Sequence, residues 1–245
     1  MELKILSFNI HKGMTWNSRL PTLPDLRALI REAGADLVFL QEVHGQNERE
    51  QERMHVDFDS QYEFLADEVW HHYCYGKNAV YDHGHHGNVI LSKYPISEWH
   101  KQDISTNRWE QRGILSAKID LMTEPKTFLQ AYCVHLNLFA KSRVIQYAAL
   151  EKKILSESDP TMPLILAGDF NDWNHHARKT LEQPLQLHDC HKTVHGRYAK
   201  TFPSLLPILS LDRIYVRNVK VMNAEALKHA SGMSDHLPLM ANISL

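Results

Sequence analysis

The sequence predicts an α/β fold, a four-layer α/β/β/α sandwich of two mixed β-sheets flanked by helices. Two observations lead to this fold class. About nine to eleven short strand-like runs are separated by tight turns, whereas few stretches have helical periodicity. A helix, a buried strand and then an acid follow one another twice, over Leu26–Glu42 and Val144–Asp169. Such a pattern fits two packed sheets with helices on their outer faces and strand ends that share one cleft.

The strand-like runs are short, apolar or alternating, and bounded by turn residues. They are expected, in chain order, at Lys4–Ile10, Asp36–Leu40, Asn88–Leu91, Gly113–Leu121, Thr127–His135, Leu164–Ala167, Asp212–Val216 and Pro238–Ile243. Residues 43–66 are polar and charged, and are expected to form a loop with some helix.

Two helices have recognisable boundaries or faces. Thr22 can cap the first, which has Pro24 and Asp25 in its first turn and Gly34 as its stop signal. Lys141–Leu155 is amphipathic and predicts the second helix. The residues expected on its apolar side are Ile145, Ala148, Ala149 and Leu155.

Composition indicates an ordinary soluble protein. With 245 residues, 43% of them hydrophobic and 23% charged, the chain is expected to fold as a single domain over residues 1–245. A formal net charge of -2 indicates no overall basic field for nucleic acid, although a local basic groove is compatible with it. Three distant cysteines without a C-x-x-C motif argue against a disulfide framework or a thiolate zinc site. No run resembles a signal peptide or a transmembrane segment, so a cytoplasmic location is expected, and nothing indicates an obligate protein partner.

Polar residues end or interrupt several of the strand-like runs, where side chains from different strands can converge. They are Asn9, Glu42, His135, Asp169, Asn171, Asp212, Asp235 and His236. Each short motif alone is also compatible with a turn. Together, oxygen donors suit Mg²⁺ or Mn²⁺, and histidines can donate to phosphate or transfer protons. The set therefore predicts metal-assisted hydrolysis of a phosphoric ester, and no G-x-S-x-G, Walker or H-E-x-x-H motif competes with it.

Seven short motifs occur in a fixed order along the chain. They are Ser7-Phe-Asn9, Gln41-Glu-Val43, Gly87–Ser92, Val134-His-Leu136, Gly168-Asp-Phe-Asn171, Leu211–Ile214 and Ser234-Asp-His236. In this order they resemble the endonuclease/exonuclease/phosphatase superfamily, which has the DNase I-like fold, over essentially the whole chain. The segments Asn9–Gly13, His85–Asn88, Thr201–Pro203 and Leu211–Tyr215 are most similar to its bacterial YbhP-like members.

The resemblance implies a metal site and a catalytic set. Glu42 would be the main metal carboxylate, with Asn9 and Asp235 beside it as further contributors, and the ion would be Mg²⁺ or Mn²⁺. Asp169 and Asn171 would position and activate the attacking water.

The remaining site residues would handle the phosphate. His236 would contact it, and Asp212 would orient His236, since a carboxylate bonded to an imidazole fixes its tautomer and favours its protonated form. His135 would be a second phosphate-binding residue. Arg112, His86 and Asn88 are the expected substrate-binding residues, and Asp82 would be an acid that orients His135.

Several alternatives fit the same sequence. The phosphodiester substrate can be nucleic acid, or a phospholipid or other small diester. A phosphomonoesterase, or a phosphate- or nucleic-acid-binding protein without activity, is the alternative function, and His83–His86 is an alternative site for a transition metal. Four tryptophans lie in loop-like stretches, where partial burial is their commonest fate, although they could also stack on bases or touch lipid. They are Trp16, Trp70, Trp109 and Trp173.

Overall fold

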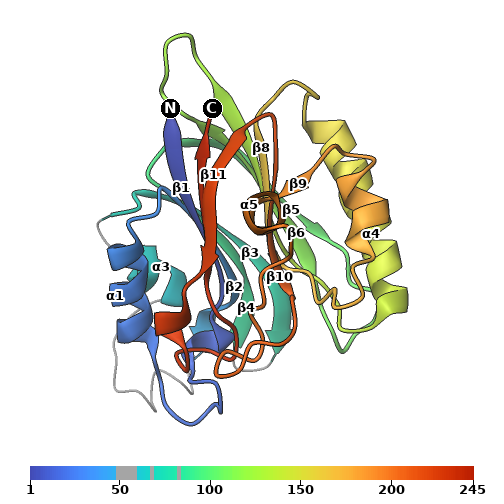
Figure 1. Ribbon diagram of the computed structural model, residues 1–245. Helices are drawn as coiled ribbons and strands as arrows, with labels where there is room; N and C mark the ends of the chain where they lie inside the picture. Colours follow the sequence, from blue (N-terminus) through green and yellow to red (C-terminus); the bar gives the residue numbers. More distant parts are fainter. Residues whose placement is uncertain (48–59, 67–68, 82–83) are drawn as a thin grey trace.

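Two six-stranded mixed sheets pack face to face, with helices on their outer faces, in the computed structural model (Figure 1). It describes residues 1–47, 60–66, 69–81 and 84–245. The first sheet has the order β11(Lys220–Ala226), β12(Leu239–Ser244), β1(Glu2–Asn9), β2(Leu37–Asn47), β4(Gly84–Ser92), β3(His72–Tyr81). The second has the order β5(Ile96–Asp103), β6(Gly113–Asp120), β7(Phe128–His135), β8(Leu164–Asp169), β10(Asp212–Arg217), β9(His188–Asp189). The predicted four-layer α/β/β/α fold class is confirmed.

The helices in the described ranges are few and mostly short. They are α1(Leu23–Ala33), α3(Gln61–Ala66), α4(Ala140–Glu157) and α5(Cys190–His195), with single turns η1(His11–Gly13), η2(Arg178–Glu182) and η3(Lys228–Ala230). None of them is both long and apolar enough to cross a bilayer.

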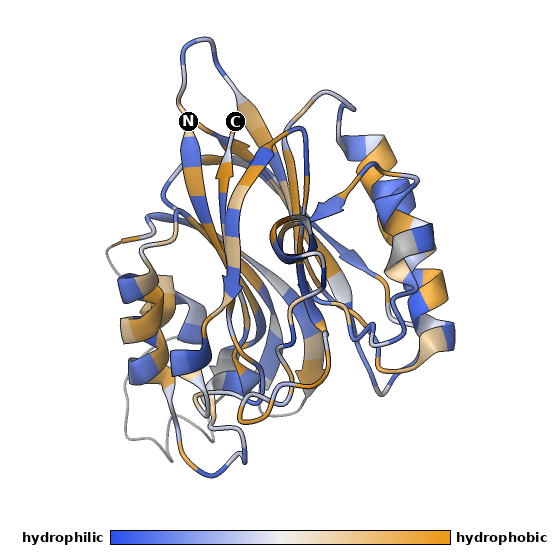
Figure 2. Ribbon diagram, in the orientation of Figure 1, coloured by the Kyte–Doolittle hydropathy of each residue, from blue (hydrophilic) through white to orange (hydrophobic). Residues whose placement is uncertain are grey.

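Three apolar clusters hold the four layers together. One lies between the sheets and includes Phe39 and Leu115. A second packs α1 on the outer face of the first sheet, and a third packs α4 on the outer face of the second. Figure 2 shows apolar residues along the strands of both sheets and on these two helices. Burial on both faces explains why the central strands are nearly continuous apolar runs in the sequence.

Strand register brings the ends of the central strands to one edge of the sandwich. Strands β1 and β2 are parallel, as are β7 and β8, so Asn9 pairs with Gln41 and His135 pairs with Asp169. Antiparallel β10 begins at Asp212, which pairs with Asp169. The polar residues that end these strands are therefore carried to one place.

The structure differs from the sequence predictions in the number of strands and in details of two helices. Four strands were not predicted: β3, β5, β9 and β11. Strand β5 is largely exposed, so it lacks the apolar run that marks a buried strand. Helix α1 begins and ends as expected, with Gly34 in the left-handed conformation. However, the Thr22 hydroxyl donates to the carbonyl of Met233 instead of capping the helix.

The predicted apolar side of α4 is wrong. Ile145 and Leu155 are 61% and 64% exposed, whereas Tyr147, Leu150 and Ile154 are buried. Polar side chains share the buried side because the fold gives them partners: Arg143 donates to two backbone carbonyls and Gln146 to the Ile104 carbonyl. Buried polar groups are tolerated when they are hydrogen-bonded, and this is not visible in the sequence.

Gly168 is expected to be essential for folding. Its φ of 143° disfavours other residues, and a Cβ there would lie 1.9 Å from the Val134 carbonyl oxygen. We expect Gly168→Ala to lower the free energy of unfolding by about 3 kcal/mol or more, since strain and a backbone clash act together. Urea denaturation measures the loss.

Gly196→Ala is the matched control for that substitution. Gly196 also has a positive φ, 71°, but nothing lies within 4 Å of the position that a Cβ would take, so only conformational strain of about 1 kcal/mol is expected. Equal losses in the two variants would contradict the clash argument.

Candidate active site

The two sheets meet at the edge where the polar strand ends gather. Asn9, at the end of β1, donates through Nδ2 to Asp169 Oδ2 at the end of β8, at 3.2 Å. His135, at the end of β7, lies 4.0 Å from a Glu42 oxygen on β2. The structure thus brings together residues that lie far apart in the sequence.

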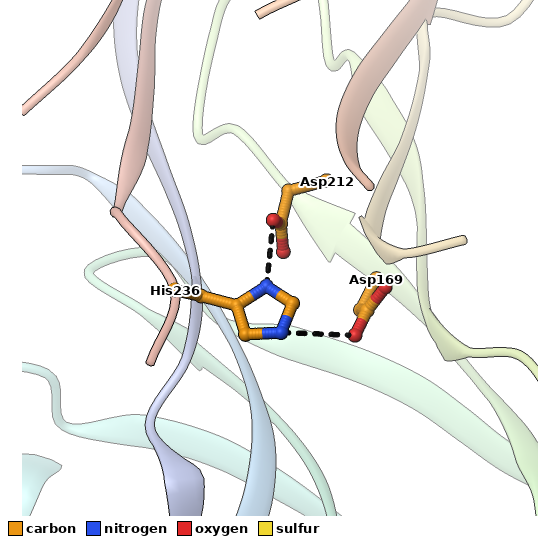
Figure 3. A group of neighbouring side chains, drawn as sticks. All are labelled: Asp169, Asp212 and His236. Carbon is orange, nitrogen blue, oxygen red and sulfur yellow. Dashed lines mark hydrogen bonds and ion pairs between the residues drawn. The ribbon is translucent and has the colours of Figure 1, made fainter. Parts of the chain in front are cut away.

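A carboxylate, an imidazole and a second carboxylate form a buried chain (Figure 3). His236 Nδ1 donates to Asp212 Oδ2 at 2.8 Å, and His236 Nε2 lies 3.7 Å from Asp169 Oδ2. The Thr201 hydroxyl also donates to Asp212 Oδ2, at 2.5 Å. Asp212 Oδ2 is therefore held by both Thr201 and His236.

Burial and charge set opposite protonation tendencies within this chain. Burial alone would lower the pKa of His236, but the carboxylates of Asp212 and Asp169 raise it to about 10. Burial and the negative charge of Asp212 raise the pKa of Asp169 to about 6, although the positive charge of His236 opposes this rise. At neutral pH, His236 is thus an imidazolium and Asp169 is ionised.

Asp169 is the centre of several further contacts. Its Oδ1 accepts the backbone N–H of Asn171 at 2.9 Å, and Oδ2 lies 3.5 Å from His135 Nε2. Asn171 has a φ of 49° and donates through Nδ2 to the Leu136 carbonyl at 2.9 Å. These bonds fix the loop after β8 and hold Asp169 and Asn171 side by side.

His135 is buried and neutral. Burial, together with the nearby positive charges of Arg112 and His236, lowers its pKa well below the ordinary value for histidine. A neutral imidazole can donate from one ring nitrogen and accept at the other, which suits hydrogen bonding to a substrate oxygen.

Glu42 projects from an irregular part of β2. The register of β2 against β4 shifts between Leu40 and Val43, and Glu42 itself has a φ of 56°. Bulges of this kind often redirect a side chain next to an active site. The Glu42 side chain is 19% exposed, and no described residue donates a hydrogen bond to its carboxylate.

Positive charge surrounds that carboxylate. Burial would raise the pKa of Glu42, but Lys12, His86, His11 and Arg112 lower it below the ordinary value. An ionised carboxylate without a hydrogen-bond donor fits the expectation that Glu42 contributes an oxygen to a hard cation. Asp235, 26% exposed, lies 3.3 Å from His11 Nδ1.

The donor atoms of Asp169, Asp212 and His236 lie within 4.8 Å of one another, which is also a spacing compatible with a metal ion. However, a histidine that binds a metal must offer an unprotonated nitrogen. Both ring nitrogens of His236 face carboxylates, which favour its protonated form. The geometry is therefore better suited to proton transfer and charge stabilisation than to metal binding.

The three expected substrate-binding residues differ in their surroundings. The Arg112 side chain is 13% exposed, and its Nε is buried without a hydrogen-bond partner among the described residues. His86 lies beside Glu42, and burial lowers its pKa to about 4. Asn88 is buried, and its Nδ2 donates to the carbonyls of Gly113 and Cys133. Arg112 Nε and Asn88 Oδ1 are thus both buried without a hydrogen-bond partner among the described residues.

Sequence reasoning assigned no role to several residues that the fold brings to the site. The positive charge of Lys12 lowers the pKa of Glu42. The Thr201 hydroxyl donates to Asp212, and the Phe202 ring centroid lies 5.0 Å from that of His236. The left-handed backbone of Lys12, with φ 59°, cannot be deduced from its sequence neighbours. Asp82 and His83 lie outside the described residues.

The four tryptophans expected in loops differ in exposure. Trp70 is 1% exposed and donates to the Ala35 carbonyl, as expected of a core tryptophan. Trp16 and Trp173 are 48% and 39% exposed, which is the expected partial burial, whereas Trp109 is 81% exposed and departs from that expectation.

A hollow of about 910 Å³ lies elsewhere, lined by parts of α1, α5 and β11. None of the candidate site residues lines it. The candidate site is therefore separate from this hollow.

Comparison with known proteins gives a consistent result. The sequence profile of the Endonuclease/Exonuclease/phosphatase family matches residues 6–236. The chain is 42% identical over 247 residues to the "Uncharacterized protein YbhP" of Escherichia coli K12, a match that covers 99% of this chain and 96% of that protein. The resemblance to YbhP-like bacterial proteins is thereby confirmed.

Solved structures share the fold at low sequence identity. An endonuclease/exonuclease/phosphatase from Beutenbergia cavernae has a TM-score of 0.76 at 19% identity, covering 100% of this chain and 72% of that one. D. rerio TDP2 complexed with a single-strand DNA product has a TM-score of 0.71 at 18% identity, covering 100% and 99%. A mannosyl-6-phosphatase from Bacteroides thetaiotaomicron has a TM-score of 0.70 at 18% identity, covering 99% and 100%. At these identities the structures establish the fold and not the substrate.

Proposed function

Because the chain belongs to the endonuclease/exonuclease/phosphatase family, we propose that it is a divalent-cation-dependent phosphoesterase that hydrolyses phosphodiester bonds. The observation that carries the proposal is the buried Asp212–His236–Asp169 chain beside the ionised carboxylate of Glu42, to which no described residue donates a hydrogen bond. Residues 1–245 would act as one domain, since both sheets contribute to this one site.

The proposed metal residues are Glu42, Asn9 and Asp235. Their oxygen atoms are the donor type that Mg²⁺ and Mn²⁺ prefer. The Glu42 carboxylate fits such an ion because it accepts no hydrogen bond from the described part of the chain. When bound, the ion would stabilise negative charge on the phosphate oxygens. Asn9 would also hold Asp169 in place through the bond from Nδ2.

The protein groups would divide the remaining chemistry among themselves. Ionised Asp169 would accept the proton of the attacking water, which Asn171 helps to position. Protonated His236, oriented by Asp212, would stabilise charge on the phosphate, and neutral His135 would donate a hydrogen bond to it. Arg112, together with His86 and Asn88 behind it, would contact or shape the substrate phosphate.

Turnover of a small aryl phosphodiester tests the proposal directly. The protein is stripped with a chelator, and Mg²⁺ or Mn²⁺ is then restored, with an aryl monoester compared in parallel. We expect metal-dependent hydrolysis with preference for the diester. Preference for the monoester would instead support a phosphomonoesterase, the activity named for the Bacteroides thetaiotaomicron structure. No turnover of either would support a binding protein.

The pH profile should have an acid limb set by Asp169. Because burial raises the pKa of Asp169 to about 6, protonation removes the base below this pH, and kcat/KM should rise as pH increases through about 6. The high pKa of His236, about 10, should keep the imidazolium charged until strongly alkaline pH. A kcat/KM that is constant from about pH 5 to about pH 7 would contradict the role of Asp169 as base.

A further inference from the structure

Exposed apolar side chains surround the end of the sandwich at which the candidate site lies. We name six of them the apolar rim: Trp16, Trp109, Phe139, Trp173, Leu205 and Leu206. Trp109 is 81% exposed, Leu206 71% and Phe139 67%. Large apolar side chains that gather in water at one place usually mark an interaction surface.

The strand registers place every rim residue near the site. Five of the six lie a short distance along the chain from a site residue, and Leu205 directly precedes one of them. The pairs are Asn9 and Trp16, Trp109 and Arg112, His135 and Phe139, Asn171 and Trp173, and Leu206 and Asp212. The loops that carry them leave or enter strands at the same edge, because Asp103 pairs with Gly113, and Asp212 pairs with Asp169. In Figure 1 this edge is the lower end, opposite the two termini.

Local contacts join the rim residues that belong to the side of the first sheet. The backbone N–H of Trp16 donates to the Gly232 carbonyl at 3.2 Å. A Cβ at Gly232 would lie 3.8 Å from the Trp16 ring and 3.9 Å from Leu205, so these two side chains approach the same residue. The neighbouring Ser204 donates its N–H to the carbonyl of Asp235.

A second set of contacts joins the rim on the side of the other sheet. The Arg143 guanidinium lies 4.7 Å from the Trp173 ring centroid and donates to the carbonyl of Leu138, next to Phe139. Glu110, next to Trp109, accepts a hydrogen bond from Asn137. Because Asn9 and Asp169 bond across the sheets, the site lies between the two halves of the rim.

The charge of these loops is opposite to that of the whole chain. In loops 14–22, 104–112, 136–142 and 200–210, every exposed charged side chain is basic. These side chains are Arg19, Arg108 and Lys141, together with Lys200, which also lines the hollow between α1, α5 and β11. The chain as a whole has a formal net charge of -2, so positive charge is concentrated beside the rim.

The composition of the rim favours a lipid surface over nucleic acid. Tryptophans can stack on bases, but Leu205 and Leu206 have no π-face and no side-chain hydrogen-bond donor with which to contact a nucleotide. Tryptophan and leucine beside basic residues are the combination that enters the interface of an anionic membrane.

We propose that the apolar rim docks this end of the protein on an anionic phospholipid bilayer. The substrate of the enclosed site would then be a phosphodiester of a lipid head group, and this second part rests on the proposed function. Docking would bring a membrane-held phosphate to Glu42 and His236.

Vesicle flotation in the presence of a chelator tests docking without catalysis. Wild-type protein is expected to float with vesicles of phosphatidylglycerol and phosphatidylcholine, and less with phosphatidylcholine alone. Trp109→Ser and Leu206→Ser should each weaken binding by about tenfold, since each removes a large apolar side chain from the interface. Leu155→Ser is the matched control, because Leu155 is 64% exposed on α4, outside the rim; it should float as the wild type does.

Three outcomes would overturn docking: no flotation of the wild type, equal flotation of the rim variants, or an equal loss in Leu155→Ser. Oligonucleotide binding or dimerisation that depends on the rim, without flotation, would also overturn it.

Hydrolysis of a water-soluble diester and of the vesicle lipid is measured in parallel with added Mg²⁺. Flotation without turnover of either substrate would support docking and overturn the proposed function. Turnover of the soluble diester alone would overturn the lipid substrate.

Discussion

Asp169→Asn is expected to lower kcat/KM for a phosphodiester by about 10²- to 10⁴-fold, the usual effect of losing a general acid or base. The substitution keeps the size of the side chain but removes the charge that makes Asp169 a base. In the wild type, Asn9, His135 and His236 all lie close to Asp169 Oδ2. In the variant, these three residues would face an uncharged amide oxygen or an amide N–H instead. His236→Ala should give a loss of similar size, since it removes the imidazolium between the two carboxylates.

Activity and folding must be measured separately in these variants. Steady-state kinetics gives the loss of activity, and thermal unfolding followed by circular dichroism shows that the variants are folded. Asp36→Asn is the control, because Asp36 immediately precedes β2 at the opposite end of the sandwich and binds Lys93 and the Lys4 backbone. Near-full metal-dependent activity in either Asp169→Asn or His236→Ala would show that the site assignment is wrong.

Glu42→Gln is expected to abolish the response to Mg²⁺ at concentrations that saturate the wild type. Even residues that only support a metal ligand typically change affinity or activity by about 10- to 100-fold, so loss of the main carboxylate should have at least this effect. Without the negative charge of Glu42, the positive charges of Lys12 and Arg112 are no longer balanced, so they repel the cation and weaken its binding further.

Thermal unfolding distinguishes loss of metal binding from loss of catalysis. A ligand that binds only the folded state raises Tm, so Mg²⁺ should raise the Tm of the wild type and of Asp169→Asn, but not that of Glu42→Gln. An unchanged shift in Glu42→Gln would assign the ion to other residues. If Asp169→Asn also lost the shift, then Asp169 would itself belong to the metal site.

The sequence revealed the central strands well because each is buried on both faces. The run Leu164–Ala167, for example, is apolar throughout, and the structure buries every residue of β8. Edge strands were missed for the converse reason, since β5 and β11 are mostly exposed and carry polar residues in the sequence. The inward side of α4 was misjudged because Arg143, Gln146 and Lys153 are buried with partners that lie outside the helix or at its end.

The family and the candidate residues could be identified from the sequence, because residue types, strand ends and the order of the motifs are all visible in it. Contacts made on folding were needed to show which ring nitrogen of His236 faces Asp212, that Lys12 and Arg112 lie near Glu42, and that Trp109 is 81% exposed. These facts depend on contacts between β1, β8, β10 and the loops between strands, which are distant in sequence. A side chain's charge environment and exposure are set by its neighbours in space, and the pairing of the two sheets is what supplies those neighbours.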